Sequence, residues 1–166
     1  MASLVLDLQA QAEHGGGAFA TLLSDDASLL DAVALVLRRI GQHARLGLYR
    51  ARGLAVAVDA ANDAAPEHAL LAGRGAERLA SRITHAGALF VGARSAVAFG
   101  DYVAGSQHSL PTGGTARYAS ALRVTDFVRF ETRVVVRRPA RLARAGATVA
   151  RYEGMRYHAA SMEVRS

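Results

Sequence analysis

Gln11 and His14 lie close to the start of the chain and carry side chains that can bind a metal ion. Residues three apart share one face of a helix, so a short helix could direct both side chains at a single ion. Gln is, however, an unusual zinc ligand beside His, Cys and carboxylate. A solvated helix face is the alternative interpretation of this pair.

Glu67 and His68 form a second candidate pair, directly after Pro66. Proline suits the first position of a helix because its missing N–H needs no intrahelical partner there. The sequence therefore predicts a helix start that holds Glu67 and His68 in a fixed geometry, as proton transfer requires. The alternative is an acidic first turn that complements the helix dipole, followed by a surface histidine.

Residues 100–117 concentrate turn-forming and polar side chains, among them Asp101, Tyr102 and His108. So many such residues in one run indicate a loop that builds a site. Taken alone, Asp101 could equally serve a turn after Gly100.

Glu153 and His158 are a third candidate pair, close to the end of the chain. A spacing of five places two side chains about 140° apart on a helix, so they need not touch one another. Without further context, both would be surface residues of a solvated tail.

Four segments, taken together and in chain order, resemble the catalytic segments of histidinol dehydrogenase: residues 8–14, 62–68, 100–117 and 153–160. That family is a zinc enzyme that uses NAD to oxidise L-histidinol to L-histidine. The resemblance extends over nearly the whole chain, from Leu8 to Arg165. One departure is Gln107, where the family usually has Asn before the histidine of this loop.

The resemblance implies a role for each candidate residue. The zinc ligands would be Gln11, His14, Asp101 and His158. His68 would be the general base that takes the substrate hydroxyl proton, and Glu67 would activate the water of the second oxidation. The substrate would contact the four zinc ligands and His68, and also Tyr102, His108 and Glu153. The chain has no Cys, which excludes thiolate zinc sites.

The resemblance also implies partners. The family's cofactor domain precedes the segment with which this sequence begins, and the sequence has no Gly-x-Gly-x-x-Gly phosphate-binding motif. Three glycines at 15–17 are interpreted as a flexible turn. The NAD site is therefore expected on the N-terminal part that this chain lacks. In the family the tail reaches into the neighbouring subunit, which predicts a homo-oligomer or association with the missing half.

Composition and charge fit a folded protein of one domain with a tail. The chain has 166 residues, of which 51% are hydrophobic, and its net charge is +6. It has no apolar run long enough for a bilayer and no signal segment, so we expect a cytoplasmic protein without membrane contact. Residues 117–166 carry 11 Arg and 4 acidic residues. We nevertheless expect no nucleic-acid binding, because these Arg alternate with apolar residues and no recognised motif accompanies them.

Apolar spacing predicts alternating helices and strands. We expect helices through Gln11 and over 27–40, 54–62, 76–83, 125–132, 140–151 and 155–164. Strands are expected over 18–23, near 70, and over 88–91 and 134–136. Residues 24–26 are candidates to cap the first long helix. The region 38–54 is shorter than the family pattern and is expected to omit a strand.

These elements predict an α/β fold: an incomplete layered α/β domain over residues 1–136 and a helical C-terminal tail over 137–166. Two functions remain open. The chain could carry the zinc and substrate half of a histidinol dehydrogenase, or it could be a catalytically inactive stand-alone remnant that binds metal or a protein partner.

Overall fold

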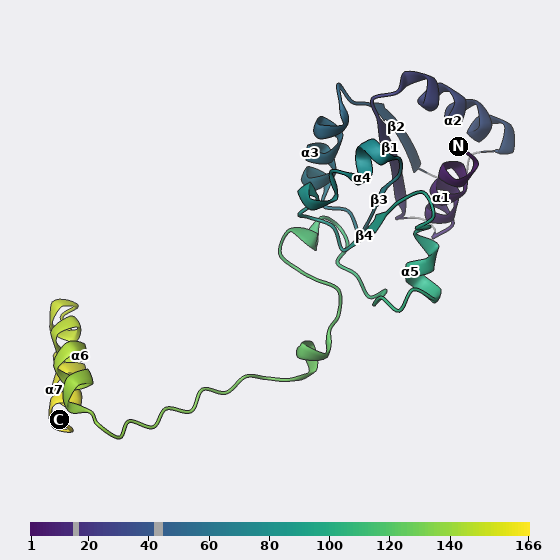
Figure 1. Cartoon of the computed structure of the whole chain (residues 1–166). Coiled ribbons are helices and arrows are strands. Elements are labelled where there is room, and N and C mark those ends of the chain that lie inside the picture. Colours follow the sequence, from purple (N-terminus) through teal and green to yellow (C-terminus); the bar gives the residue numbers. More distant parts are fainter. Residues whose placement is uncertain (15–16, 42–44) are drawn as a thin grey trace. The chain divides into compact units, whose positions relative to one another are not determined.

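The computed structural model describes residues 1–14, 17–41 and 45–166 (Figure 1). Gly15 and Gly16, where a flexible turn is expected, lie outside the described residues. The chain divides into two compact units, Met1–Phe127 and Val128–Ser166. The predicted boundary between 136 and 137 stays a prediction.

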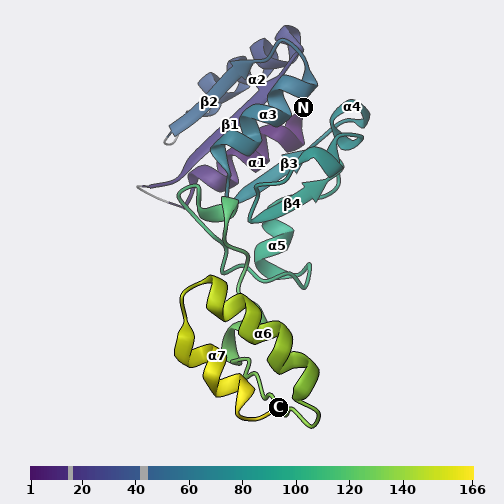
Figure 2. The ribbon, with the colours of Figure 1, turned by 90° about the vertical axis from the view of Figure 1, so that its left-hand side faces the viewer.

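The first half of the first unit is a parallel strand pair with helices. Its elements are α1 (Ala2–Ala12), β1 (Phe19–Ser24), α2 (Ala27–Ile40) and β2 (Arg45–Arg50). β1 and β2 run parallel, and Phe19 pairs with Arg45 at the start of the register (Figure 2). The expectation of an omitted strand between 38 and 54 was wrong, because β2 forms within that region.

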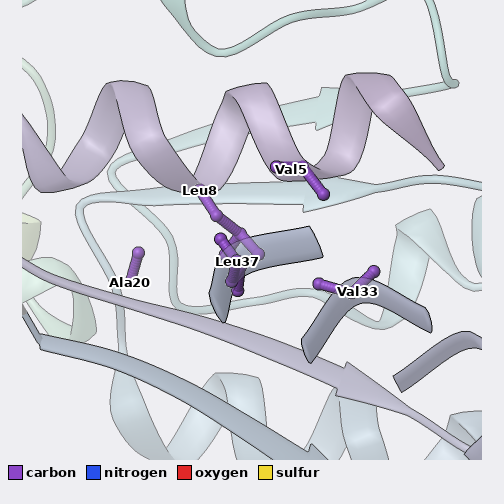
Figure 3. Packing of buried hydrophobic residues seen from close by; sticks show 5 residues of the cluster. All are labelled: Val5, Leu8, Ala20, Val33 and Leu37. Atoms are coloured by element: carbon purple, nitrogen blue, oxygen red, sulfur yellow. The ribbon is translucent and has the colours of Figure 1, made fainter. Parts of the chain in front are cut away.

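The hydrophobic core of this half lies between the two helices and the strands. Val5 and Leu8 of α1 meet Val33 and Leu37 of α2, and Ala20 of β1 completes the cluster (Figure 3). Leu22, Leu46 and Leu48 pack against it, as the twofold alternation of strands requires. A contiguous apolar cluster of this kind holds α1, and with it Gln11, against the strands.

Asp26 begins α2, as the sequence predicted for the segment 24–26. Its Oδ1 accepts hydrogen bonds from the backbone N–H of Ser28 at 2.9 Å and of Leu29 at 3.2 Å. The Ser28 hydroxyl also donates to the same oxygen, at 2.6 Å. These bonds satisfy backbone donors that have no partner within the helix. The Ser28 hydroxyl, followed by the Leu29 amide, lowers the pKa of Asp26 below its usual 3.8.

The second half of the first unit contains α3 (Leu54–Ala64), β3 (His68–Leu71), α4 (Arg74–Glu77), η1 (Ala80–Arg82), β4 (Ala88–Val91) and α5 (Ala98–Tyr102). Two short helices, η2 (Thr115–Arg117) and η3 (Val124–Phe127), follow. β3 and β4 form a second parallel pair, in which His68 is opposite Ala88. The helix expected over 76–83 is interrupted between Glu77 and Ala80.

The end of α3 corrects the prediction for Pro66. The buried Ala65 adopts a left-handed conformation with φ 44°, and its N–H bonds to the carbonyl oxygens of Ala61 and Asn62. This closes the helix, and Pro66 cannot continue it. Proline therefore follows a helix here instead of starting one, and His68 opens strand β3.

The second unit is a helical hairpin preceded by a segment without regular structure. Its helices are α6 (Ala140–Tyr152) and α7 (Arg156–Glu163), joined by a turn in which Gly154 has φ 76°. Small buried residues and one methionine form the interface: Ala147, Ala150, Ala159 and Met162. A Cβ at Gly146 would lie 2.6 Å from the Met162 sulfur, so glycine permits the close approach.

Two predictions for residues 125–136 were wrong. Helical structure ends at Phe127 instead of continuing to 132, and residues 134–136 form no strand. β-branched residues favour strands only where a neighbouring strand supplies hydrogen bonds and packing. Val134 is 76% exposed, which shows that such a neighbour is lacking within this unit.

The remaining elements confirm an α/β fold of alternating strands and helices. Within the described ranges, no helix is both long and apolar enough to cross a membrane.

Candidate functional site

His68 and Asp101 come together although 32 positions separate them in the sequence. The Nε2 atom of His68, in β3, lies 3.7 Å from Oδ1 of Asp101, in α5. Their side chains are only 10% and 19% exposed. The distance is too long for a good hydrogen bond but short enough for a carboxylate to stabilise an imidazolium. Nε2 is buried and has no hydrogen-bond partner among the described residues.

The start of the β3–β4 pair fixes the backbone of His68. The amides of Gly87 and Ala88 donate to the carbonyl oxygens of Pro66, at 3.0 Å, and of Glu67, at 2.8 Å. These bonds set the register in which His68 is opposite Ala88. The Glu67 side chain is half-buried. His68 is therefore held by a strand and not by the exposed helix start that the sequence suggested, and a paired strand is a more precise support than a loop.

Asp101 is positioned by α5 and by the loop that follows. Gly100, directly before it, is buried against the Phe90 ring of β4. The Ser106 hydroxyl donates to the Gly100 carbonyl oxygen at 3.2 Å and ties the loop back to the helix. Asp101 thus belongs to a short helix, not to the isolated turn that was its alternative interpretation.

Hydrogen bonds between side chains and backbone groups hold the segment 62–68 in place and join it to the segment 100–117. Asn62, the first residue of segment 62–68, donates from Nδ2 to Arg82 O at 2.8 Å and accepts at Oδ1 from Thr84 N, also at 2.8 Å. Arg117, the last residue of the segment 100–117, donates to the carbonyl oxygen of Asp63 near the end of α3. Both side chains therefore hold the chain around His68.

Sequence reasoning assigned no role to Phe90 or Gly87, which also support the site. The ring centroids of Phe90 and His68 lie 5.9 Å apart, with 43° between the ring planes. A Cβ at Gly87 would lie 2.6 Å from Glu67 O and 3.1 Å from Pro111 Cδ. The alternation of β4 could have indicated Phe90, since strand residues two apart share a face.

The structure does not place Tyr102 and His108 with this pair. Tyr102 ends α5 and is 85% exposed, and His108 lies in an exposed part of the loop. Their assignment to the substrate pocket stays a prediction.

Gln11 and His14 lie at the end of α1. Gln11 is half-buried in the last turn, and His14 is exposed, two residues beyond the helix. His14 Nδ1 lies 3.1 Å from the carbonyl oxygen of Ala10. Ligand histidines typically donate one ring N–H to such an oxygen, which leaves the other nitrogen free for a metal.

Glu153 and His158 belong to the second unit. Glu153 ends α6, the turn at Gly154 follows, and His158 lies in α7. The angle of about 140° expected for a shared helix was therefore wrong, because a turn separates the two residues. Both side chains are exposed.

Nowhere in residues 1–14, 17–41 and 45–166 do three His, Asp or Glu side chains gather closely enough to hold a metal ion. The chemical types of Gln11, His14, Asp101 and His158 nevertheless suit zinc, which binds nitrogen and oxygen ligands at catalytic sites. Three of these residues belong to the first unit and His158 to the second.

Comparisons with known proteins show the same family that the four segments suggested. The family model of histidinol dehydrogenase matches residues 1–166. A histidinol dehydrogenase of Thiocapsa roseopersicina is 39% identical, and the match covers 98% of this chain and 76% of that protein. One from Pseudomonas syringae pv. syringae is 37% identical, and the match covers 98% of this chain but 39% of that protein.

A solved structure supports the same relationship. The crystal structure of histidinol dehydrogenase from Elizabethkingia anophelis matches with a TM-score of 0.85 and 28% identity, over 98% of this chain and 41% of that chain. The chain therefore spans about two fifths of the length of several relatives that it matches. Because the family model covers every residue, the chain belongs to the histidinol dehydrogenase family.

Proposed function

We propose that this chain carries the zinc and substrate half of a site that oxidises L-histidinol to L-histidine with NAD. The observation that supports this most directly is the buried pair of His68 and Asp101, with Nε2 3.7 Å from Oδ1. An alcohol oxidation needs a base for the hydroxyl proton and a stabilising charge beside it.

His68 takes the hydroxyl proton at Nε2, the nitrogen that is buried and has no hydrogen-bond partner in the described part of the chain. The imidazolium formed in this step lies beside the Asp101 carboxylate, which stabilises its charge. Exclusion of water strengthens this attraction, because both side chains are at least four-fifths buried. Glu67 precedes His68 in the chain and activates the water consumed in the second oxidation.

Gln11, His14, Asp101 and His158 hold the metal in this proposal. Zinc would supply a positive charge that binds the imidazole and amino groups of histidinol. The contact of His14 Nδ1 with Ala10 O supports a ligand role for its other nitrogen. A carboxylate has two oxygens, so Asp101 can contact both the metal and His68. Tyr102, His108 and Glu153 complete the contacts to the substrate.

The nicotinamide is held outside these 166 residues, in the part of the family enzyme that this chain does not cover. The coverage of about two fifths of several relatives supports this division. Hydride transfer needs the nicotinamide within roughly 3 to 3.5 Å of the alcohol carbon. In this proposal the chain holds the nicotinamide at that distance only together with the part of the family enzyme that it does not cover. The isolated chain would then bind histidinol without appreciable turnover.

An NADH absorbance assay tests the proposal. The chain is mixed with histidinol and NAD, alone and with the complementary part of a full-length relative. We expect NADH only in the mixture, and a loss of about 100-fold or more for His68→Asn. His85→Asn is the matched control and should retain activity, because its backbone amide, not its ring, makes the contact to Asn62.

NADH production by the chain alone would contradict the division of the site. Absence of NADH in both settings would favour the alternative of a remnant that binds metal or a partner without catalysis.

A further inference from the structure

Phe90 contacts His68 and also approaches α5, the helix that carries Asp101. In the β3–β4 register Phe90 is opposite Leu70, two residues beyond His68. Strand residues two apart share a face, so Phe90 and His68 are on the same side of the pair. Their ring centroids are 5.9 Å apart at 43°, a tilted contact that is common for aromatic rings.

The Phe90 ring also meets Gly100, the residue before Asp101. A Cβ at Gly100 would lie 2.6 Å from Phe90 Cζ and 3.1 Å from Cε1. The backbone at Gly100 does not have the positive φ that requires glycine at several other positions. Glycine is therefore needed here for space: it allows α5 to approach the ring, while Ser106 holds its carbonyl oxygen.

The ring of Phe90 thus meets both the His68 side chain of β3 and the backbone of α5. The ring contacts His68, and Asp101 follows directly after the glycine that the same ring meets. The resulting separation of 3.7 Å leaves Nε2 free of a direct hydrogen bond and beside the carboxylate. A closer approach would engage Nε2 with Asp101, and a wider one would remove the stabilising charge.

We propose that Phe90 is a positioning residue that holds His68 and Asp101 at their working separation. This inference rests on the proposed function, in which these two residues act together. The neighbours of Phe90 in β4 have no such role: Leu89 and Val91 belong to the opposite face and are 38% and 41% exposed.

A double-mutant cycle on the zinc-free chain tests the inference without relying on activity. The probe is the set of ring proton and ring nitrogen chemical shifts of His68, recorded by NMR at one fixed pH and assigned with His68→Asn. The variants are Gly100→Ala, Phe90→Ala and the double variant. Leu89→Ala is the matched control, because it removes an apolar side chain from the same strand but from its other face.

Gly100→Ala should move the His68 resonances, because the new methyl group displaces the Phe90 ring. In the Phe90→Ala background most of that effect should disappear, since the intermediary is gone. Leu89→Ala should leave the His68 resonances in place. Equal effects of Gly100→Ala in both backgrounds, or no effect in either, would overturn the positioning role.

Phe90→Leu provides a milder variant, in case Phe90→Ala does not fold. It retains apolar volume but cannot reach Gly100, so the His68 resonances should shift and Gly100→Ala should add little to that shift. In the reconstituted enzyme Phe90→Leu should lower kcat about 10-fold with KM for histidinol within about 2-fold. Wild-type His68 shifts and an unchanged kcat in this variant would contradict the inference. If the wild-type mixture is inactive, that result contradicts only the proposed function. The positioning role of Phe90 is still tested by the NMR double-mutant cycle, which does not depend on activity.

Discussion

Gly87 lies against the carbonyl group of Glu67 so closely that a Cβ at position 87 would be 2.6 Å from that oxygen. The contact occurs where β3 and β4 begin to pair, one residue before His68. Pro111, from the loop after α5, packs against the same glycine at a Cβ distance of 3.1 Å. One small residue therefore brings together the strand pair and the loop around the candidate site.

Gly87→Ala should destabilise the first unit and disturb the site. The atom that it meets belongs to the backbone, which cannot turn aside as a flexible side chain can. We expect a loss of about 1–3 kcal/mol in the free energy of unfolding, as for other overpacked positions. Urea denaturation followed by circular dichroism measures it. Gly53→Ala, where a Cβ would meet nothing within 4 Å, should cost less, and equal losses would contradict the steric argument.

Asn62 should be required for stability because one side chain bonds to three backbone groups. Nδ2 donates to Arg82 O, while Oδ1 accepts from Thr84 N and from His85 N. Asn62→Ala leaves these groups without partners, and we expect a loss of about 1–3 kcal/mol on unfolding. Asn62→Asp is the informative comparison, since it keeps the acceptor but replaces the donor that faces Arg82 O. In thermal unfolding, the melting temperature of Asn62→Asp should lie between those of the wild type and of Asn62→Ala.

The sequence predicted features that depend on residues close together in the chain. Asp26 could be identified as a cap because the hydroxyl and amides that it binds lie within three residues. In β2, Leu46 and Leu48 are two apart and both face the core, so the sequence carried the period-two signal of a strand. That signal was overlooked because the region is shorter than the family pattern. His68 and Asp101 could also be identified from the sequence as candidate site residues.

Features that depend on distant contacts could not be predicted in the same way. Proline is common both at the first position of a helix and just after its end. Pro66 follows the end of α3, because Ala65 adopts the left-handed conformation that closes the helix. Val134 has strand preference but no neighbouring strand in its unit. The proximity of His68 and Asp101 depends on the β3–β4 register and on the approach of α5 to Phe90, which no local pattern encodes.

Two carboxylates should change stability with pH in opposite directions. Hydrogen bonds lower the pKa of Asp26, so its stabilising contribution is present above pH 3.8 and is lost as the pH falls through the folded value. Burial raises the pKa of Asp7, so its ionised form disfavours the folded state as the pH rises above 3.8. Asp26→Asn should lower the melting temperature at pH 7, and Asp7→Asn should raise it. The difference for Asp7→Asn should vanish toward pH 3, whereas the difference for Asp26→Asn should shrink only as the pH falls below 3.8. Differences that do not change with pH would contradict the titration argument.

Zinc binding should depend on one histidine from each unit. His14 and His158 are both proposed ligands, so His14→Ala and His158→Ala should each weaken zinc binding at least about 10-fold, since even loss of an outer-shell partner has an effect of that size. Metal analysis after dialysis against a zinc buffer measures it. His85→Ala serves as the matched control and should retain the metal. Unchanged zinc content in both ligand variants would falsify the ligand assignment.

The final prediction concerns which chains share a site. If the second unit of one chain supplies His158 to the first unit of another, Asp101→Asn and His158→Asn chains are each defective alone but complement one another. In a mixed dimer one site contains both defects and the other contains neither. Random exchange makes about half of all dimers mixed, so about one quarter of all sites should regain zinc. Mixing Asp101→Asn chains with the double variant should restore none, which controls for zinc held elsewhere. A monomer by light scattering, or dimers that exchange subunits without regaining zinc, would show that His158 does not act between chains.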